Sequence, residues 1–278
     1  MKIELKCPVC NRPLRQDERV FICPQSHSFD LAKEGYLNLL LNAKPTAGDS
    51  KAMMNARRKF LAAGYYEQLS NAVNLKISQA IAAQADAHAI VDIGCGEGYY
   101  LSRFQTQHPS EKLQYFGLDI SKLGIKMAAK KSPQIQWLVA NFAHLPFMDH
   151  SADVILSMFA EYSVAEMNRI CSDQGIIILV RAGDNHLIEL KNVIYPEIHE
   201  KERLDSIKPF PNFKVERQEV TFKTTITNNE DLMSLLLMTP HYWKIKSEGL
   251  DNLKKLKSLT VTVSIEIDYI SRNNSNQI

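Results

Sequence analysis

Long apolar runs are missing from this chain of 278 residues. No segment approaches the roughly 20 consecutive apolar residues that a membrane-spanning helix needs, which excludes a protein anchored by such a helix. The N-terminus also lacks the apolar region of a secretory signal peptide, because its first residues lead directly into a cysteine motif. We therefore expect a cytoplasmic protein that works without a membrane.

Cysteine is scarce, and its number is odd. Five cysteines in a chain of this length do not suggest a disulfide framework, and three of them fall within the first 23 residues. Internal repeats and low-complexity tracts are also absent. The apolar content of 45% is enough to bury a full-sized core, so we expect one enzyme-sized domain with a small appendage.

The N-terminal cysteines and one histidine are spaced as metal ligands. Two residues separate Cys7 from Cys10, and three residues separate Cys23 from His27. Three thiolates and one imidazole suit tetrahedral zinc, and four protein ligands leave no position for a catalytic water. Ordinary buried thiols and a surface histidine are the alternative, but paired spacing is far more specific than a lone cysteine. The pattern predicts a structural zinc site.

Basic charge is concentrated in the same part of the chain. Residues 1–64 contain 11 Lys and Arg against 6 Asp and Glu, whereas the rest contains 22 against 25. Residues 42–49 are rich in turn formers and predict a linker. We therefore predict a zinc-binding module over residues 1–45 and a second domain over residues 46–278. Exposed basic residues of the module either border a surface that contacts RNA or form an ordinary solvated face: Arg12, Arg15, Arg19 and Lys33.

After residue 88 the chain alternates short apolar runs with amphipathic stretches. The apolar runs predict strands at 89–93, 115–119, 135–139, 154–157 and 175–180, and the stretches predict helices at 99–107, 122–131 and 164–171. This alternation indicates right-handed crossovers and a mainly parallel sheet covered on both faces. Further patterns predict helices at 50–63, 67–85, 186–194 and 230–238, a strand at 214–225, and an antiparallel edge strand at 259–269.

The first of these strands ends in an acid and a glycine-rich loop, from Asp92 to Gly98. Glycines let the backbone approach a ligand closely at the carboxyl end of a strand. A dinucleotide-binding loop would need glycine at position 99, where this chain has Tyr99, and a P-loop would need Gly-Lys-Ser or Gly-Lys-Thr. The spacing of Gly94, Gly96 and Gly98 is instead typical of the S-adenosylmethionine loop, with Asp92 supporting the methionine end. A tight turn without a ligand is the alternative.

Two polar residues follow the neighbouring strands. Asp119 ends the second strand, where its carboxylate can accept hydrogen bonds from a ribose diol. Enzymes that use NAD share this device, so Asp119 alone does not identify the cofactor. Asn141 follows the third strand, and we predict it near the adenine, with an ordinary loop role as the alternative.

These motifs together resemble those of one family, the bacterial 23S ribosomal RNA (guanine-N1)-methyltransferases, in which a zinc module precedes a methyltransferase domain. The resemblance covers nearly the whole chain. The matching stretches are Cys-Pro-Val-Cys at 7–10, Cys-Pro-Gln-Ser-His-Ser-Phe-Asp at 23–30, Ala-Lys-Glu-Gly-Tyr-Leu-Asn-Leu-Leu at 32–40, Gly-Asp-Ser at 48–50, Met-Met-Asn-Ala-Arg-Arg at 53–58, Asp-Ile-Gly-Cys-Gly-Glu-Gly-Tyr-Tyr at 92–100, Gly-Leu-Asp-Ile-Ser-Lys at 117–122, Leu-Pro-Phe at 145–147, His-Leu at 186–187, Glu-Leu-Lys at 189–191 and Met-Thr-Pro at 238–240.

The resemblance implies an α/β class I methyltransferase fold, Rossmann-like with a mainly parallel seven-stranded sheet, joined to a small N-terminal zinc-binding domain. It implies zinc at Cys7, Cys10, Cys23 and His27, and cofactor contacts from Tyr66, Gly96, Glu97 and His186. It also implies a homodimer that recognises a hairpin of 23S ribosomal RNA. Residues 159–163 depart from the family pattern, which has a proline there, so the resemblance does not fix the target nucleotide.

The implied reaction transfers a methyl group from S-adenosylmethionine to N1 of guanine. This in-line displacement needs alignment and exclusion of water rather than a nucleophilic side chain. N1 carries a proton and lies on the Watson–Crick edge, so the base must be unpaired and the proton removed. We predict that Glu161, or another group on the segment 159–163, holds the guanine edge. The basic residues 57–59 either contact phosphates or form a solvated helix face.

Two other functions stay open at this point. A methyltransferase acting on a small metabolite would use the same cofactor loop, but the zinc module and its basic surplus would have no clear task. A ribosome-binding protein that no longer catalyses would need neither the intact glycine loop nor Asp119.

Overall fold

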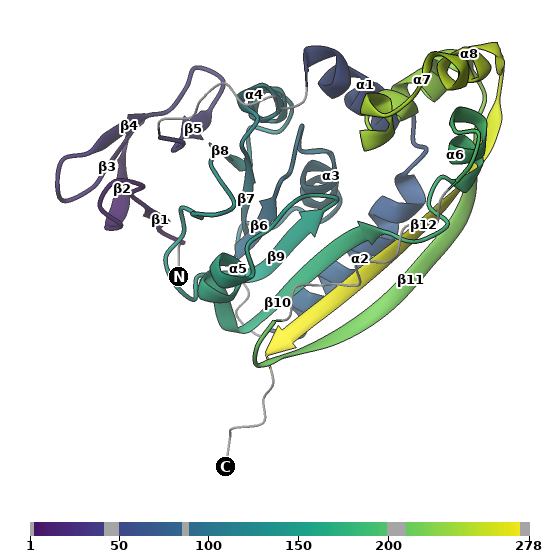
Figure 1. Cartoon of the computed structure of the whole chain (residues 1–278). Coiled ribbons are helices and arrows are strands. Elements are labelled where there is room, and N and C mark those ends of the chain that lie inside the picture. Colours follow the sequence, from purple (N-terminus) through teal and green to yellow (C-terminus); the bar gives the residue numbers. More distant parts are fainter. Residues whose placement is uncertain (1–2, 42–49, 85–88, 199–209, 273–278) are drawn as a thin grey trace.

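The computed structural model describes residues 3–41, 50–84, 89–198 and 210–272, so the predicted linker at 42–49 lies outside the described residues. The described residues form two sheets (Figure 1). One has four strands in the order β1-β2-β3-β4, and the other has eight strands in the order β11-β12-β10-β9-β6-β7-β8-β5. Among the described residues, no helix is long and apolar enough to cross a membrane.

The small sheet is antiparallel throughout. Its strands are β1 (Leu5–Lys6), β2 (Pro13–Asp17), β3 (Val20–Ile22) and β4 (Ser28–Asp30). Asn11, Glu18 and Ser26 have φ between 49° and 61° in the turns, a conformation that short polar residues tolerate best. Leu5 bridges to Phe147, which places the small sheet against the loop after β8.

The large sheet is parallel except at one end. Its strands are β5 (Tyr36–Asn38), β6 (Ala89–Ile93), β7 (Gln114–Asp119), β8 (Gln136–Val139), β9 (Ala152–Met158), β10 (Cys171–Ala182), β11 (Phe213–Ile226) and β12 (Leu259–Arg272). The predicted fold class is confirmed, with one strand more than the seven expected. The extra strand is β5, whose three residues pair in parallel with β8. A run that short carries no alternation by which the sequence could reveal it.

One predicted feature of the last strand is wrong. We expected an edge strand at 259–269, but β12 lies between β10 and β11 and is antiparallel to both. The edge strand is β11, and most of its residues are exposed. The error has a physical cause, because alternation along a strand shows which face is buried and not how many neighbours the strand has.

Helices cover the large sheet, and the first of them has the expected cap and stop. They are α1 (Lys51–Ala62), α2 (Glu67–Ala82), α3 (Tyr99–Gln107), α4 (Lys122–Lys131), α5 (Val164–Ile170), α6 (Ile188–Ile194), α7 (Asn229–Leu237) and α8 (Ser247–Lys255), with a 3-10 helix, η1 (Pro240–Trp243). The Ser50 hydroxyl accepts a hydrogen bond from the Met53 N–H at the start of α1, and Gly64 follows its end at φ 85°. The sequence did not predict α8 or η1.

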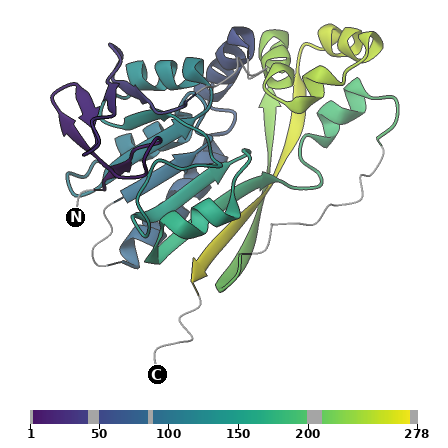
Figure 2. The ribbon, with the colours of Figure 1, turned by 60° about the vertical axis from the view of Figure 1, so that its left-hand side comes forward.

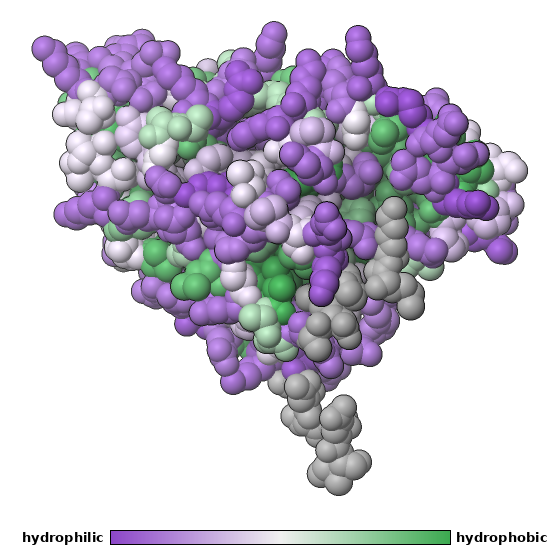
Figure 3. All heavy atoms as spheres, turned by 180° about the vertical axis from the view of Figure 1, so that it is seen from behind, coloured by the Kyte–Doolittle hydropathy of each residue, from purple (hydrophilic) through white to green (hydrophobic). Residues whose placement is uncertain are grey.

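The core lies on both faces of the large sheet, because its central strands are buried on both faces and mostly apolar. Ile90 of β6 packs in the cluster that includes α2, whereas the next residue, Val91, packs in the cluster that includes α5 and the small sheet. The small sheet and α8 lie at opposite ends of the molecule (Figure 2). Seen from behind, hydrophilic side chains cover most of the surface, with small hydrophobic areas between them (Figure 3).

Candidate functional site

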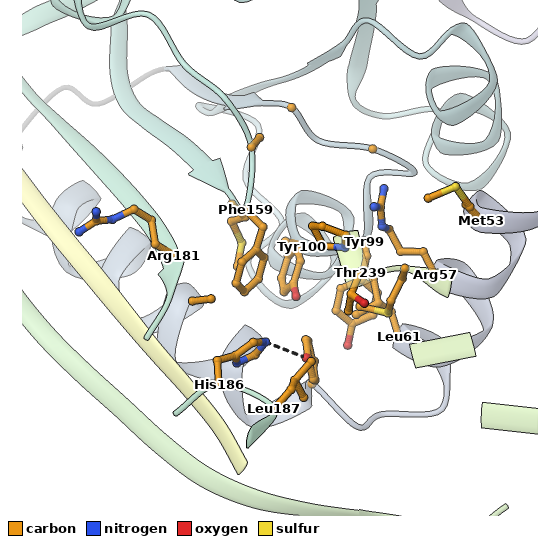
Figure 4. A pocket seen from close by; sticks show the side chains of 18 of the residues that line it. Met53, Arg57, Leu61, Tyr99, Tyr100, Phe159, Arg181, His186, Leu187 and Thr239 are labelled. Atoms are coloured by element: carbon orange, nitrogen blue, oxygen red, sulfur yellow. Dashed lines mark hydrogen bonds between the residues drawn. The ribbon is translucent and has the colours of Figure 1, made fainter. Parts of the chain in front are cut away.

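The order of the strands creates a crevice at the carboxyl end of β6. β6 pairs with β7 on one side and with β9 on the other, so successive strands lie on opposite sides of it. Open α/β sheets bind ligands at such a switch point. A cavity of about 710 Å³ lies there, lined by the loop after β6, the ends of β9 and β10, α1, and the segments around α6 and η1 (Figure 4).

The three glycines of the loop after β6 have positive φ angles of 75°, 58° and 79°. A Cβ on Gly94 would lie 2.3 Å from the Cβ of Ala160, and a Cβ on Gly98 would lie 2.4 Å from the ring of Trp137. A Cβ on Gly96 would have no neighbour closer than 3.4 Å. Gly94 and Gly96 therefore border the cavity, while Gly98 is needed for close packing beneath the loop.

Two carboxyl groups are buried beside this loop. Asp92 and Glu97 are each 2% exposed, and both line the cavity. Neither Oδ1 of Asp92 nor either carboxylate oxygen of Glu97 has a hydrogen-bond partner among the described residues. Burial, and to a lesser extent the charge of Asp119, raises the pKa of Asp92 to about 8. Burial also raises the pKa of Glu97, although Lys131 Nζ, 4.0 Å from its Oε2, opposes this.

These carboxyl groups fit S-adenosylmethionine. The cofactor carries an amino group, ribose hydroxyls and a positively charged sulfonium, which supply the donors and the charge that buried carboxyl oxygens lack. The phosphates of a dinucleotide offer only acceptors, so they would leave these oxygens without donors. Asp92, Gly94, Gly96 and Glu97 can therefore hold this cofactor, and each individual contact stays a prediction.

Two further predicted residues meet at the other side of the cavity. The hydroxyl of Tyr66 and Nε2 of His186 are 3.3 Å apart (Figure 4). Burial raises the pKa of Tyr66. Burial, with the charge of Lys191, lowers the pKa of His186 to about 4, so its ring is neutral at pH 7. A neutral pair places no positive charge beside a cationic cofactor.

The remaining predicted residues do not line the cavity. Asp119 accepts hydrogen bonds from the N–H groups of Gly96 at 2.8 Å and Ser121 at 2.7 Å, so it ties the loop after β6 to the end of β7. Oδ1 of Asn141 accepts a hydrogen bond of 2.9 Å from the backbone two residues later. Glu161 is exposed on the segment after β9. The ribose, adenine and catalytic roles expected of these three residues stay predictions.

The sequence missed most of the wall that faces the glycine loop. This wall includes Phe159 after β9, Arg181 of β10, and His241 and Trp243 of η1. Arg181 points toward β12, where its Nη2 lies 2.8 Å from Asp268. One signal for η1 was available in the sequence, the Met-Thr-Pro stretch at 238–240 that resembles the family. Its first two residues precede η1, and Pro240 is the first residue of η1. Phe159 lies in the segment 159–163 that was predicted to hold the guanine edge, although that prediction named Glu161 rather than Phe159. Arg181 lies at a strand end without any motif, so nothing in the sequence marked it.

The predicted zinc ligands converge in the small sheet. One ligand atom from each of Cys7, Cys10, Cys23 and His27 lies within 4.8 Å of all the others. Cys10 Sγ is 3.6 Å from Cys23 Sγ, and Cys7 Sγ is 3.7 Å from His27 Nδ1. Zinc bonds to sulfur and nitrogen require separations of about 3.3–3.8 Å between tetrahedral ligands. The four residues therefore fit zinc, with no position left for a catalytic water.

Two family models match different parts of the chain. The zinc-ribbon model described as "RlmA, N-terminal" matches residues 5–44, which include the four clustered ligands. The model described as "Methyltransferase domain" matches residues 90–175, which include the glycine loop and β9.

Individual proteins are similar over most of the chain. The 23S rRNA (guanine(748)-N(1))-methyltransferase of Streptomyces fradiae is 31% identical over 243 residues, which cover 86% of this chain and 85% of that protein. YxjB of Bacillus subtilis (strain 168) is 28% identical, and the match covers 94% of this chain and 95% of YxjB. YxjB is provisionally assigned as a 23S rRNA (guanine-N(1)-)-methyltransferase. The solved structure of the Bacillus subtilis YcgJ protein matches this chain with a TM-score of 0.46 and 18% identity. The match covers 72% of this chain and 99% of the YcgJ chain.

Proposed function

Because the chain belongs to the 23S ribosomal RNA (guanine-N1)-methyltransferase family, we propose that it transfers a methyl group from S-adenosylmethionine to N1 of a guanine in a hairpin of 23S ribosomal RNA. The observation that carries this proposal is the match to the Streptomyces fradiae enzyme at 31% identity over 86% of the chain. A metabolite methyltransferase is disfavoured, because the zinc ribbon is part of the family match.

The cavity is suited to this reaction. When bound, S-adenosylmethionine supplies an electrophilic methyl group. The buried carboxyl groups of Asp92 and Glu97 would hold the polar end of the cofactor, and the neutral Tyr66 and His186 line the other side of the cavity. Burial of Asp92, Glu97 and Tyr66 excludes water, and the ends of β9 and β10 leave room for the guanine beside the loop.

Guanine N1 must pass its proton to a base or to water as the N1–carbon bond forms and the sulfur–carbon bond breaks. Glu161 lies two residues after Phe159, which lines the cavity, and we keep Glu161 as the residue that holds the guanine edge. Turnover of Glu161→Ala with saturating RNA checks this role, because alanine offers no oxygen to the guanine edge. Turnover equal to that of the wild-type protein removes Glu161 from the mechanism.

A second groove provides a surface for the RNA backbone. It has a volume of about 410 Å³ and lies between α1 and α4, where Lys51, Arg58, Lys130 and Lys131 line it. Glu97 lines both this groove and the cavity, so the two are adjacent. Cations that line such a groove neutralise phosphates, which makes binding dependent on salt.

Other parts of the proposal extend beyond this site. A reaction on ribosomal RNA takes place in the cytoplasm, and the family resemblance implies a homodimer, which light scattering on the purified protein will test.

The division into a zinc module at 1–45 and a methyltransferase domain at 46–278 is also part of the proposal. β5 lies before this division but pairs with β8 of the large sheet, so the two parts share a strand pairing.

Transfer of labelled methyl groups tests the function. Purified protein with labelled S-adenosylmethionine is expected to label naked 23S ribosomal RNA and to leave a metabolite extract unlabelled. Primer extension on ribosomal RNA from a strain without the protein then locates the guanine, because the stop caused by N1 methylation disappears and returns on complementation. Labelling of metabolites alone, or binding of cofactor without any transfer, contradicts the proposal.

The groove needs its own variant. We expect a triple variant to show a shallower dependence of log affinity on log salt; it combines Lys51→Gln, Arg58→Gln and Lys130→Gln. The slope should fall by about 2–3, because each lost phosphate contact removes about 0.7–0.9. The matched control replaces Lys112, Lys223 and Lys255, which are exposed and line neither cavity nor groove. Equal slopes for the two triple variants show that the groove does not bind RNA.

A further inference from the structure

In the described part of the chain, the exposed aromatic side chains lie in one region, at the cavity. Three aromatic residues of the described chain are exposed, and these are Phe159 at 45%, Tyr242 at 36% and Trp243 at 69%. Phe159 and Trp243 line the cavity, and Tyr242 packs edge-on against Trp243 with ring centroids 5.3 Å apart. The other described aromatic residues are buried or half-buried. Large apolar surface that stays exposed at a cavity mouth marks a site of contact.

Phe159 is held in an unfavourable backbone conformation. Its φ of 53° is uncommon for a bulky residue and costs free energy that the surrounding structure must offset. Its N–H donates to the carbonyl of Val180 at 2.9 Å, and Ala160 packs so closely on Gly94 that no side chain fits there. These contacts hold the Phe159 backbone beside the glycine loop, and its ring lies 6.1 Å from the ring of His186 (Figure 4).

Trp243 also lines the cavity and lies on a short, anchored element. The hydroxyl of Tyr195 lies 2.9 Å from Nδ1 of His241, which links η1 to the residue after α6. The N–H groups of Lys244 and Ile245 both donate to the carbonyl of His241 at 3.0 Å. The exposure of Trp243 is therefore a property of an ordered turn.

The charges around this mouth suit a nucleic acid. Arg57, Lys191 and Lys244 line the cavity, while its acidic residues, Asp92 and Glu97, are buried at its inner end. A protein partner with an apolar surface would not require these cations. An unpaired stretch of RNA offers both phosphates for the cations and flat bases for the rings, and single-stranded bases are commonly bound by stacking on aromatic side chains.

We propose that Phe159 and Trp243 form a stacking site for unpaired bases of the RNA, with Phe159 against the target guanine and Trp243 against a neighbouring base. This inference rests on the proposed function. Phe159 takes the target because it adjoins the loop that holds the methyl donor, and Trp243 takes a neighbour because it is the more exposed of the two. The rings thus compensate for the stacking that the guanine loses when it leaves its strand.

Tryptophan fluorescence tests Trp243 directly, because the chain contains two tryptophans and Trp137 is fully buried. A 23S ribosomal RNA hairpin is expected to quench the emission of Trp243 on binding. Trp243→Phe removes this quenching, since only Trp137 still emits. Quenching of equal size in Trp243→Phe, or none in the wild-type protein at saturating RNA, overturns the role of Trp243.

Kinetics test Phe159 with three variants. Phe159→Leu keeps apolar bulk without a π face, and it is expected to lower kcat/KM for RNA roughly 5- to 150-fold, the range for one stacked base. Phe159→Tyr keeps the face and is expected to stay within about threefold of the wild-type protein. Leu75→Ala is the control, because it removes an exposed apolar side chain of α2 that does not line the cavity.

Calorimetry with S-adenosylmethionine separates the outcomes. Unchanged cofactor affinity in all variants is expected, so that the loss in kcat/KM reports on the RNA. Equal kcat/KM in Phe159→Leu and Phe159→Tyr overturns the stacking role, and so does a change of oligomeric state in Trp243→Phe with unchanged RNA kinetics. If the wild-type protein itself does not methylate ribosomal RNA, the proposed function fails rather than the stacking site alone.

Discussion

The two sheets of this protein are stabilised in different ways. The small sheet buries few large apolar side chains, namely Leu5, Leu14 and Phe21, and its other buried residues are the predicted zinc ligands Cys7 and Cys23. The large sheet is apolar on both faces, with α2 on one side and α5 on the other. A unit as small as the first cannot bury enough surface to be stable alone, so metal coordination supplies the rest.

In the small sheet, chemistry and stability depend on local sequence. In the large sheet, they depend on packing. In the small sheet, four ligands close in sequence define both the structure and the metal. In the large sheet, the cavity forms where strands distant in sequence end side by side, and its residues range from α1 to η1. Changes in the small sheet should therefore leave the cavity intact, and the predictions below test this from the largest effect to the smallest.

The largest effect is expected from loss of zinc. Cys23→Ser should remove the metal and unfold the small sheet, because zinc binding contributes about 10–16 kcal/mol in zinc-finger peptides. Metal analysis should fall from one zinc to none per chain, and RNA methylation should be lost, while S-adenosylmethionine still binds. Loss of cofactor binding as well would show that the two sheets, which meet at Leu5 and Phe147, unfold as one unit.

A buried carboxylate of the large sheet gives the next effect. Asp268 is fully buried between Arg181 Nη2 at 2.8 Å and Arg217 Nε at 2.7 Å. Asp268→Ala should lower the free energy of unfolding by about 3 kcal/mol, the lower end for a broken buried pair, because both arginines reach solvent. Urea denaturation measures this, and zinc content should not change. The exposed pair Lys214–Glu216 is the control, and Glu216→Gln should be close to the wild-type protein.

Two glycines allow a matched comparison between backbone strain and steric contact. Gly94 and Gly35 have φ of 75° and 93°, so alanine at either position costs about 1–2 kcal/mol of strain. A Cβ on Gly35 meets nothing within 4 Å, whereas a Cβ on Gly94 meets Ala160 at 2.3 Å. Gly94→Ala should therefore weaken S-adenosylmethionine binding about tenfold or more, and Gly35→Ala should not. Equal cofactor affinity in the two variants would contradict the close approach at Gly94.

The smallest effect is a pH dependence of stability. The pKa of Asp92 is raised to about 8 in the folded protein and is about 3.9 in the unfolded chain, so unfolding releases a proton between these values. Stability therefore falls as pH rises, by at most about 1.4 kcal/mol per pH unit. The lowered pKa of His186 makes stability rise with pH between about pH 4 and 6.5. The effect of Asp92 is therefore measured most clearly between about pH 6.5 and 8. Asp92→Asn should flatten the thermal-denaturation profile there, and an unchanged slope would mean that Asp92 is ionised.

Much of the fold was predictable, because its elements obey local rules. The strand at 89–93 and the helices at 99–107 and 122–131 were predicted with the bounds that the structure has. Each has an uninterrupted apolar run or a clear cap, such as the Ser121 hydroxyl that accepts from the N–H of Gly124 at the start of α4. β5 and η1 were missed because three or four residues contain no period, and β12 was misplaced because alternation does not reveal a second neighbour.

The sequence by itself determined the zinc ligands and the cofactor loop, because in both the chemistry lies in residues a few positions apart, such as Cys7 and Cys10 or Gly94 and Gly96. Only the tertiary structure decided what surrounds them. It buried Asp92 and Glu97 without partners, paired Tyr66 with His186, and placed Phe159 and Trp243 at one cavity mouth. These relations arise from parallel crossovers, which bring strand ends and helices together across distances along the chain that no sequence spacing encodes.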